Sequence, residues 1–150
     1  MGVINFISNR NTRTSDVTLW VVNSDGSAPR DLGILGAWAC WSGDGRWRYY
    51  SALEKGTYHI RKVRMADSEV VDVRQDDAVG CSVAPDGSVL YYAKVLVQST
   101  GLWDIELRAA RPETAPSAPL GRISASRIPV DPVDIQPYVS SGGHWLAMPL

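Results

Sequence analysis

Short hydrophobic runs and polar turns alternate along the whole chain, and one arrangement of them recurs. A turn at residues 42–45 (SGDG) comes back at 84–87 (APDG) and, in a looser form, at 140–143 (SSGG), and an aromatic or aliphatic run follows each copy. Asp-Gly pairs accept the backbone of a tight hairpin, and the runs are rich in residues that favour strands. Each copy therefore predicts a strand, a turn and a strand.

A second element recurs between these copies. The runs at residues 19–22 (LWVV), 58–61 (YHIR) and 102–105 (LWDI) have a similar spacing, and turns at 24–26 and 66–68 follow the first two. Each repeat therefore contains four short strands. A repeat of about forty residues with four antiparallel strands is typical of a β-propeller blade. The predicted fold class is all-β, with blades of four antiparallel strands.

The predicted strands group into four units. We expect a partial blade over residues 4–32 that lacks its innermost strand, complete blades over 37–73 and 79–123, and a half-blade over 134–150. In the third unit the Pro- and Ala-rich stretch 111–119 predicts an exposed loop before the last strand. The two prolines within residues 127–132 predict a further crossing without a strand.

Two complete and two partial blades do not close a ring, because closed propellers contain about four to eight blades. A blade is also stable only when neighbours cover its faces. Two explanations stay open. Either further sequence completes the ring, or the half-blade of one copy pairs with the partial blade of another in a head-to-tail homo-oligomer.

The repeat resembles the TolB-like propeller repeat, in which a Ser-Pro-Asp-Gly turn precedes a hydrophobic strand and an Asp-Gly turn follows a later one. Residues 84–87 match the first turn, and the stretch from Phe6 through residues 19–21 to Asp25-Gly26 matches the second half. The departures are Gly43, where the family has Pro, and the turn at 141–143. The resemblance implies a non-catalytic module that binds or scaffolds a protein or a small ligand. The alternative is the substrate-gating propeller of a larger enzyme, such as a peptidase similar to prolyl oligopeptidase.

Composition narrows the classes of partner. Hydrophobic residues make up 45% of the chain and charged residues 21%, with a formal net charge of -1, which favours a globular protein over a disordered segment or a nucleic-acid-binding protein. No apolar stretch is long enough to span a membrane. Because no signal peptide precedes the first predicted strand, we expect a cytoplasmic protein, or a periplasmic one if the sequence belongs to a longer precursor.

Candidate chemistry is sparse. His59 and His144 are the two histidines, and neither has a Cys or a carboxylate at ligand spacing, so the sequence predicts no metal, no cofactor and no catalytic set. Cys40 and Cys81 stand near the ends of neighbouring repeats but are offset by one residue, so their side chains should point to opposite faces. We therefore expect two buried, free thiols that do not form a disulfide. Because no catalytic set is found, we expect a protein that is not an enzyme.

The connections of a four-stranded meander alternate between the two ends of the blade. The Asp-Gly turns therefore share one face, and the middle and blade-to-blade loops share the other, where varied loops on a rigid scaffold favour binding. The candidate ligand-binding residues on this loop face are Arg10, Arg13, Trp38, Glu54, Lys55, Asp76, Asp77 and Gln98.

Overall fold

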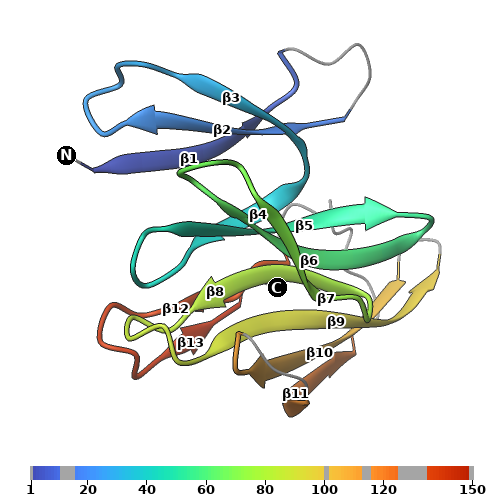
Figure 1. Ribbon diagram of the computed structural model, residues 1–150. Helices are drawn as coiled ribbons and strands as arrows, with labels where there is room; N and C mark the ends of the chain where they lie inside the picture. Colours follow the sequence, from blue (N-terminus) through green and yellow to red (C-terminus); the bar gives the residue numbers. More distant parts are fainter. Residues whose placement is uncertain (1, 11–15, 100–101, 113–115, 125–134, 149–150) are drawn as a thin grey trace.

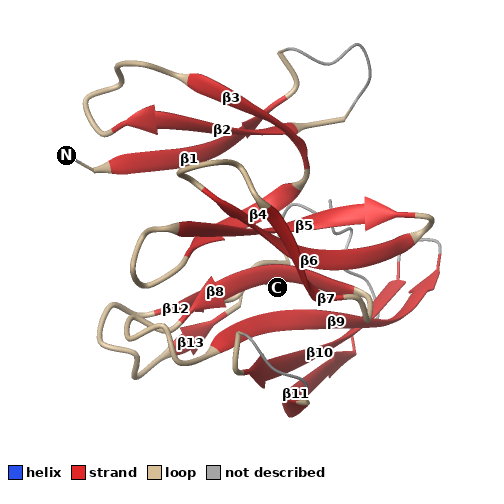
Figure 2. Ribbon diagram, viewed as in Figure 1, coloured by secondary structure: helices blue, strands red, loops and turns tan. Residues whose placement is uncertain are grey.

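The computed structural model describes residues 2–10, 16–99, 102–112, 116–124 and 135–148, and every regular element in this part is a β-strand (Figure 2). The strands are β1 (Val3–Ser8), β2 (Thr18–Asn23), β3 (Arg30–Leu35), β4 (Ala37–Trp41), β5 (Trp47–Glu54), β6 (Thr57–Arg64), β7 (Val70–Arg74), β8 (Ala78–Val83), β9 (Leu90–Ser99), β10 (Leu102–Ala110), β11 (Ser117–Ser124), β12 (Tyr138–Val139) and β13 (Leu146–Ala147).

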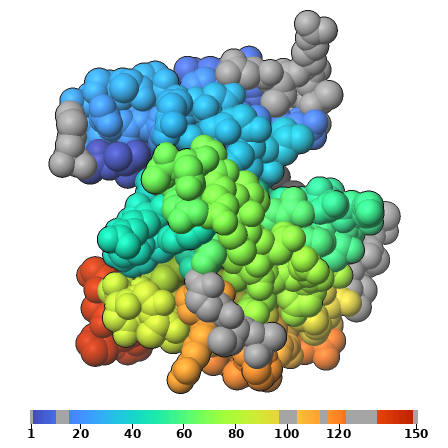
Figure 3. Space-filling model, viewed as in Figure 1, coloured from blue at the N-terminus to red at the C-terminus, as the bar shows by residue number. Residues whose placement is uncertain are grey.

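The strands form four antiparallel sheets in which sequence neighbours pair. Their orders are β1-β2-β3, β4-β5-β6-β7, β8-β9-β10-β11 and β12-β13, and we call them the first to fourth blades. Figure 1 shows the first three blades stacked in chain order, and the colours of the space-filling view in Figure 3 follow the same order. The predicted all-β class and the four-stranded antiparallel blades are confirmed.

The core lies between blades, because each inner sheet is covered on both faces. Tyr49 and Tyr50, adjacent on β5, are 3% and 2% exposed and belong to two different clusters. Tyr49 packs with Cys81 of the third blade, and Tyr50 packs with Leu19 of the first. Burying one such large side chain contributes about 2–3 kcal/mol. This arrangement explains why the strand sequences are hydrophobic at consecutive positions rather than at alternate ones.

The recurring turns have the geometry that their sequences predict. Gly45 N–H donates to the carbonyl of Ser42 at 3.0 Å, and Gly87 N–H donates to the carbonyl of Ala84 at 2.8 Å. The turns of neighbouring blades also touch. A Cβ atom at Gly43 would lie 2.8 Å from the carbonyl oxygen of Pro85, which explains why glycine replaces the proline of the family pattern there.

Two predicted bounds within the first and third blades differ from the structure. The expected loop at residues 111–119 is wrong at its end, because β11 begins at Ser117 and includes Pro119. Pro119 is tolerated because β11 is the outer edge of its sheet, where a missing N–H breaks no ladder. The strand expected to end at Leu32 continues to Leu35 as part of β3.

In the half-blade expected over residues 134–150, the described residues form only the two-residue strands β12 and β13. The expected crossing at 127–132 lies outside the described residues.

The prediction that the two cysteines lie apart is wrong. Cys40 packs against the cluster of buried residues between the second and third blades that contains Cys81. Both are free thiols. The offset of one residue does place them on opposite faces of their own blades. Because blades stack face to face, those opposite faces are the two that meet.

Candidate functional site

The loop face is the end of the stack opposite the Asp-Gly turns. It carries the connections β5–β6 and β7–β8, together with the blade-to-blade link between β3 and β4 (Figure 1). Where the first and second blades meet, this face has a hollow of about 330 Å³. Its walls include Leu35 and Leu53, its aromatic side chains are Trp38 and Tyr58, and Asp16 and Ser51 supply polar groups.

Trp38 is the unusual residue of this hollow. Its φ is 49°, in the left-handed region that bulky side chains rarely adopt. The cause is a register shift between Ala37 and Cys40, where β4 has one more residue than its partner β5. The Trp38 ring meets Tyr58 edge-on, with ring centroids 6.0 Å apart, and its indole N–H is buried without an acceptor in the described part of the chain. Local strain and an unmet donor therefore coincide at one candidate residue.

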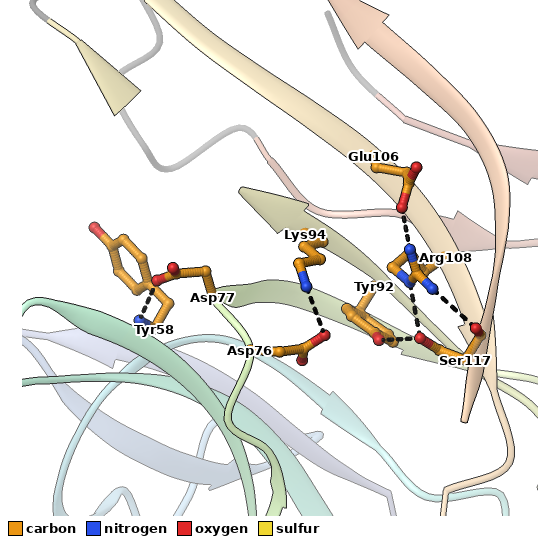
Figure 4. A network of polar contacts seen from close by, with 8 residues as sticks. All are labelled: Tyr58, Asp76, Asp77, Tyr92, Lys94, Glu106, Arg108 and Ser117. Atoms are coloured by element: carbon orange, nitrogen blue, oxygen red, sulfur yellow. Dashed lines mark hydrogen bonds and ion pairs between the residues drawn. The ribbon is translucent and has the colours of Figure 1, made fainter. Parts of the chain in front are cut away.

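Asp77 holds the neighbouring loop in place. Its carboxylate Oδ1 accepts a hydrogen bond from the backbone N–H of Tyr58 at 3.1 Å, which ties the β7–β8 connection to the start of β6 (Figure 4). Burial, and after it the negative charge of Asp77, raises the pKa of the Tyr58 phenol. Tyr58 therefore stays a neutral hydrogen-bonding group at physiological pH.

A second, outer hollow of about 580 Å³ lies between β7 and the third blade and includes Asp76, Tyr92, Arg108 and Ser117 in its lining. Its polar groups bind one another (Figure 4). Lys94 Nζ lies 3.3 Å from Asp76 Oδ2, Tyr92 Oη donates to Ser117 Oγ at 2.8 Å, and Arg108 Nε donates to the same Oγ at 2.7 Å. Arg108 also pairs with Glu106. This network joins strands β9, β10 and β11.

The structure separates the predicted site residues rather than gathering them. Trp38 lines the first hollow, and Asp77 contacts Tyr58 beside it. Glu54 instead pairs with Arg61, and Lys55, with φ of 50°, forms the β5–β6 hairpin turn.

Three further predicted residues lie elsewhere on the chain. Arg10 is exposed after β1, where its backbone N–H donates to Ser8 Oγ at 3.3 Å. Gln98 is on β9, and Arg13 lies outside the described residues.

Sequence reasoning missed the apolar members of the hollow. Leu35 and Leu53 are 57% and 62% exposed, beside the β3–β4 link and the β5–β6 hairpin. Tyr58 was assigned only to a strand. The signal that could have found them is a large apolar residue directly next to a loop on the same face, since apolar side chains that gather on an exposed surface mark interaction sites.

Among the described residues, no three His, Cys, Asp or Glu side chains lie close enough to hold a metal ion. His59 is on β6, and His144 follows the turn between β12 and β13. No helix of the described residues has the length and apolar character needed to cross a membrane.

Stacked four-stranded meanders with alternating turn and loop faces define a β-propeller. No protein-family model matches the chain, and no curated protein matches it by sequence. Solved structures do. TolB from Acinetobacter baumannii superposes with a TM-score of 0.73 at 12% identity, over 96% of this chain and 34% of that one.

Two more structures extend the comparison. A protein described as TolB from Agrobacterium tumefaciens superposes with a TM-score of 0.66 at 15% identity, over 81% of this chain and 46% of that one. An acylaminoacyl peptidase reaches 0.55 at 11% identity, over 81% of this chain and 23% of that one. The chain therefore has the fold of a TolB-like β-propeller, as part of a propeller. It spans about a third to a half of the length of the two TolB structures.

Proposed function

We propose that this chain is a non-catalytic binding module, in which the hollow around Trp38 on the loop face accepts an apolar group of a protein or of a small ligand. The observation that carries the proposal is the composition of the hollow. Two exposed leucines and two aromatic rings surround about 330 Å³, which is at the lower end of the range of ligand pockets. Exposed apolar side chains that gather around a concave surface are typical of interaction sites.

The shape of the hollow suits a segment that inserts one apolar side chain. Trp38 and Tyr58 offer ring surfaces at low cost in conformational entropy, and the strained backbone at Trp38 is held by packing against the core beside Val79 and Val95. Asp16 and Ser51 supply polar groups beside these apolar walls, so a bound segment could also form hydrogen bonds.

A titration with short peptides tests the proposal. We would add tripeptides with a central Leu, Phe or Ser to isotope-labelled protein and follow the amide signals by NMR. The Leu and Phe peptides should shift signals of Ala37, Trp38, Leu53 and Tyr58, and the Ser peptide should not. Leu53→Lys should weaken binding at least tenfold, whereas Leu120→Lys, on the 52%-exposed Leu120 of β11, should leave it unchanged. Equal effects of both variants would contradict the proposal.

The second candidate function is the propeller part of a larger enzyme. The similarity to the fold of an acylaminoacyl peptidase favours it. In that case the gene encodes a hydrolase domain beside these blades, and the full-length protein reacts with an active-site serine probe. A full-length protein without such a domain or reaction would leave the binding module as the proposal. The periplasmic alternative for the location is the one we retain, since the likeness is to TolB proteins, and cell fractionation tests it.

Both ends of the stack carry exposed apolar side chains that need cover. Ile4 on β1 is 51% exposed, and Trp145 beside β13 is 78% exposed. We propose two ways to cover them, pairing of β12 of one copy with β1 of another, or further blades. Light scattering after gel filtration separates them: a sharp dimer or larger ring supports the homo-oligomer, and a monomer contradicts it.

A further inference from the structure

The outer hollow of about 580 Å³ between β7 and the third blade has no part in the function proposed above. Its volume is within the range of about 300–1,000 Å³ that is typical of small-molecule sites. In contrast to the walls of the hollow around Trp38, most of the described residues that line it have charged, amide or hydroxyl side chains: Asp72, Arg74, Gln75, Asp76, Arg108 and Ser117. The outer hollow therefore suits a ligand that forms hydrogen bonds.

The charges around the outer hollow are of both signs. Lys94 Nζ lies 3.3 Å from Asp76 Oδ2, and Glu106 pairs with Arg108 (Figure 4). A bound anion would be attracted by the guanidinium of Arg108 but repelled by the carboxylates of Asp72 and Asp76, and a bound cation would meet the reverse. The balance of charge therefore favours a neutral ligand.

The two guanidinium groups of the outer hollow are held in fixed positions. Arg74 is 8% exposed, its guanidinium carbon lies 5.9 Å from the centre of the Tyr92 ring, and its Nη2 donates to the carbonyl of Arg111 at 2.9 Å. Arg108 donates from Nε to the Ser117 hydroxyl at 2.7 Å and from Nη2 to the Ser117 carbonyl at 2.8 Å. Because these donors are already ordered, a ligand that accepts from them would lose little affinity to the ordering of side chains.

A carboxylate and a guanidinium of the outer hollow have capacity for further hydrogen bonds. An ionised carboxylate can accept about four hydrogen bonds, and a guanidinium can donate about five. Among the described residues, Asp76 Oδ2 has Lys94 as its partner, Oδ1 is buried without a donor, and the Asp76 side chain as a whole is 38% exposed. The contacts of Arg108 with Glu106 and Ser117 use one N–H group each of Nε, Nη1 and Nη2. A hydroxyl group suits both partners, since it can donate one hydrogen bond and also accept.

We propose that the outer hollow binds a neutral, polyhydroxylated small molecule with the chemistry of a sugar. One hydroxyl donates to the Asp76 carboxylate, and a second accepts from the Arg108 guanidinium. A planar base or an aromatic ring fits less well, because Tyr92, the aromatic residue of the described lining, is fully buried and offers no exposed ring surface. This site is separate from the hollow around Trp38, so the two proposals are independent.

An NMR titration with sugars tests the proposal. Glucose, galactose, mannose and N-acetylglucosamine are added separately to isotope-labelled protein, beside phosphate, ethylammonium and N-methylacetamide as anionic, cationic and amide probes. At least one sugar should shift the amide signals of Gln75, Asp76, Arg108 and Ser117 and reach half-saturation at about 10 mM or below. No saturation by any of the four sugars, or tighter binding of one of the other three probes, would overturn the proposal. Shifts confined to the hollow around Trp38 would overturn it too, because the sugar would then occupy the other site.

Matched variants locate the bound sugar. Asp76→Ala removes a carboxylate of the outer hollow and should weaken binding about tenfold, and Gln75→Ala, at an exposed residue of the lining, should weaken it about threefold. Asp67→Ala is the control, because Asp67 is also a partly exposed carboxylate, paired with Arg64 at 3.1 Å, but lies on the β6–β7 turn. It should leave the affinity unchanged. If neither Asp76→Ala nor Gln75→Ala weakens binding more than Asp67→Ala does, the sugar does not bind in the outer hollow and the proposal is wrong.

Discussion

The innermost strands of the second and third blades have the same backbone but different side chains at one shared position. Counting back from the turns that begin at Ser42 and Ala84, Trp38 of β4 corresponds to Gly80 of β8. Their φ angles are 49° and 58°, and both strands have a register shift at this point. The repeat thus keeps a left-handed backbone at this position. The part of the protein that packs against the position determines which side chain fits there.

The reason for the difference lies in what covers each position. A Cβ atom on Gly80 would lie 2.0 Å from the carbonyl oxygen of Ile135, so the backbone of the C-terminal segment occupies that space. At Trp38 the corresponding space is available, and the ring packs beside Tyr58. The position is structural in one blade and lines the candidate site in the other.

The largest expected effect comes from Gly80→Ala. The new methyl group would collide with the Ile135 backbone and would hold a strained φ, so the free energy of unfolding should fall by about 4 kcal/mol in urea titrations. Gly87→Ala is the matched control, since Gly87 also has a positive φ but nothing within 4 Å. It should cost only about 1 kcal/mol. Similar losses for both variants would show that strain, and not the close approach, determines the effect.

Trp38→Gly makes the second blade like the third. It removes the contacts of a large, partly buried aromatic ring, which costs about 3 kcal/mol, but it also relieves the left-handed strain. We expect a net loss of about 2 kcal/mol in the free energy of unfolding. Trp145→Gly, at a ring that is 78% exposed, should cost about 0.5 kcal/mol or less. A gain in stability for Trp38→Gly would mean that strain outweighs packing there.

Ser51, which lies on β5 opposite Ala37, links the second blade to Gly80 of the third. Its Oγ accepts a hydrogen bond from the buried N–H of Gly80 at 2.9 Å. Ser51→Ala leaves that N–H without a partner, and the expected loss is about 1–2 kcal/mol by thermal or urea unfolding. The control is Ser88→Ala in an exposed turn, where about 0.5 kcal/mol or less is expected. If both variants lose the same free energy of unfolding, the hydrogen bond to Gly80 stabilises the fold no more than one in an exposed turn.

The smallest expected effect on stability concerns the turns at residues 42–45 and 84–87, from which the two strands were aligned. Hydrogen bonds from the Ser42 hydroxyl and from Arg46 N–H lower the pKa of Asp44, and those from the Ser88 hydroxyl and N–H lower the pKa of Asp86. Both carboxylates therefore stabilise the fold at neutral pH, and this contribution disappears as pH falls through their lowered pKa values. NMR titration should place both below the ordinary Asp value of 3.8. Values at or above it would contradict these hydrogen bonds.

The repeat made most of the fold predictable, because each blade folds from local hairpins with clear turn residues. How the blades pack against one another was harder to predict from the sequence. The face-to-face meeting of Cys40 and Cys81 depends on how sheets stack, and β11 could include Pro119 only because it is an edge strand. At the candidate site, Trp38 was predicted because it stands beside a blade-to-blade loop. Leu53 was not, since its exposure depends on the depth of the hollow and not on local pattern.

The order of pairing along the chain has a kinetic consequence. Every strand of the described sheets pairs with its neighbour in sequence, and the main clusters join consecutive blades. Contacts of short sequence separation form quickly, and a chain built this way can gain structure one blade at a time as it leaves the ribosome. Each new blade then needs only the preceding one as its template, so assembly behaves as growth along one dimension.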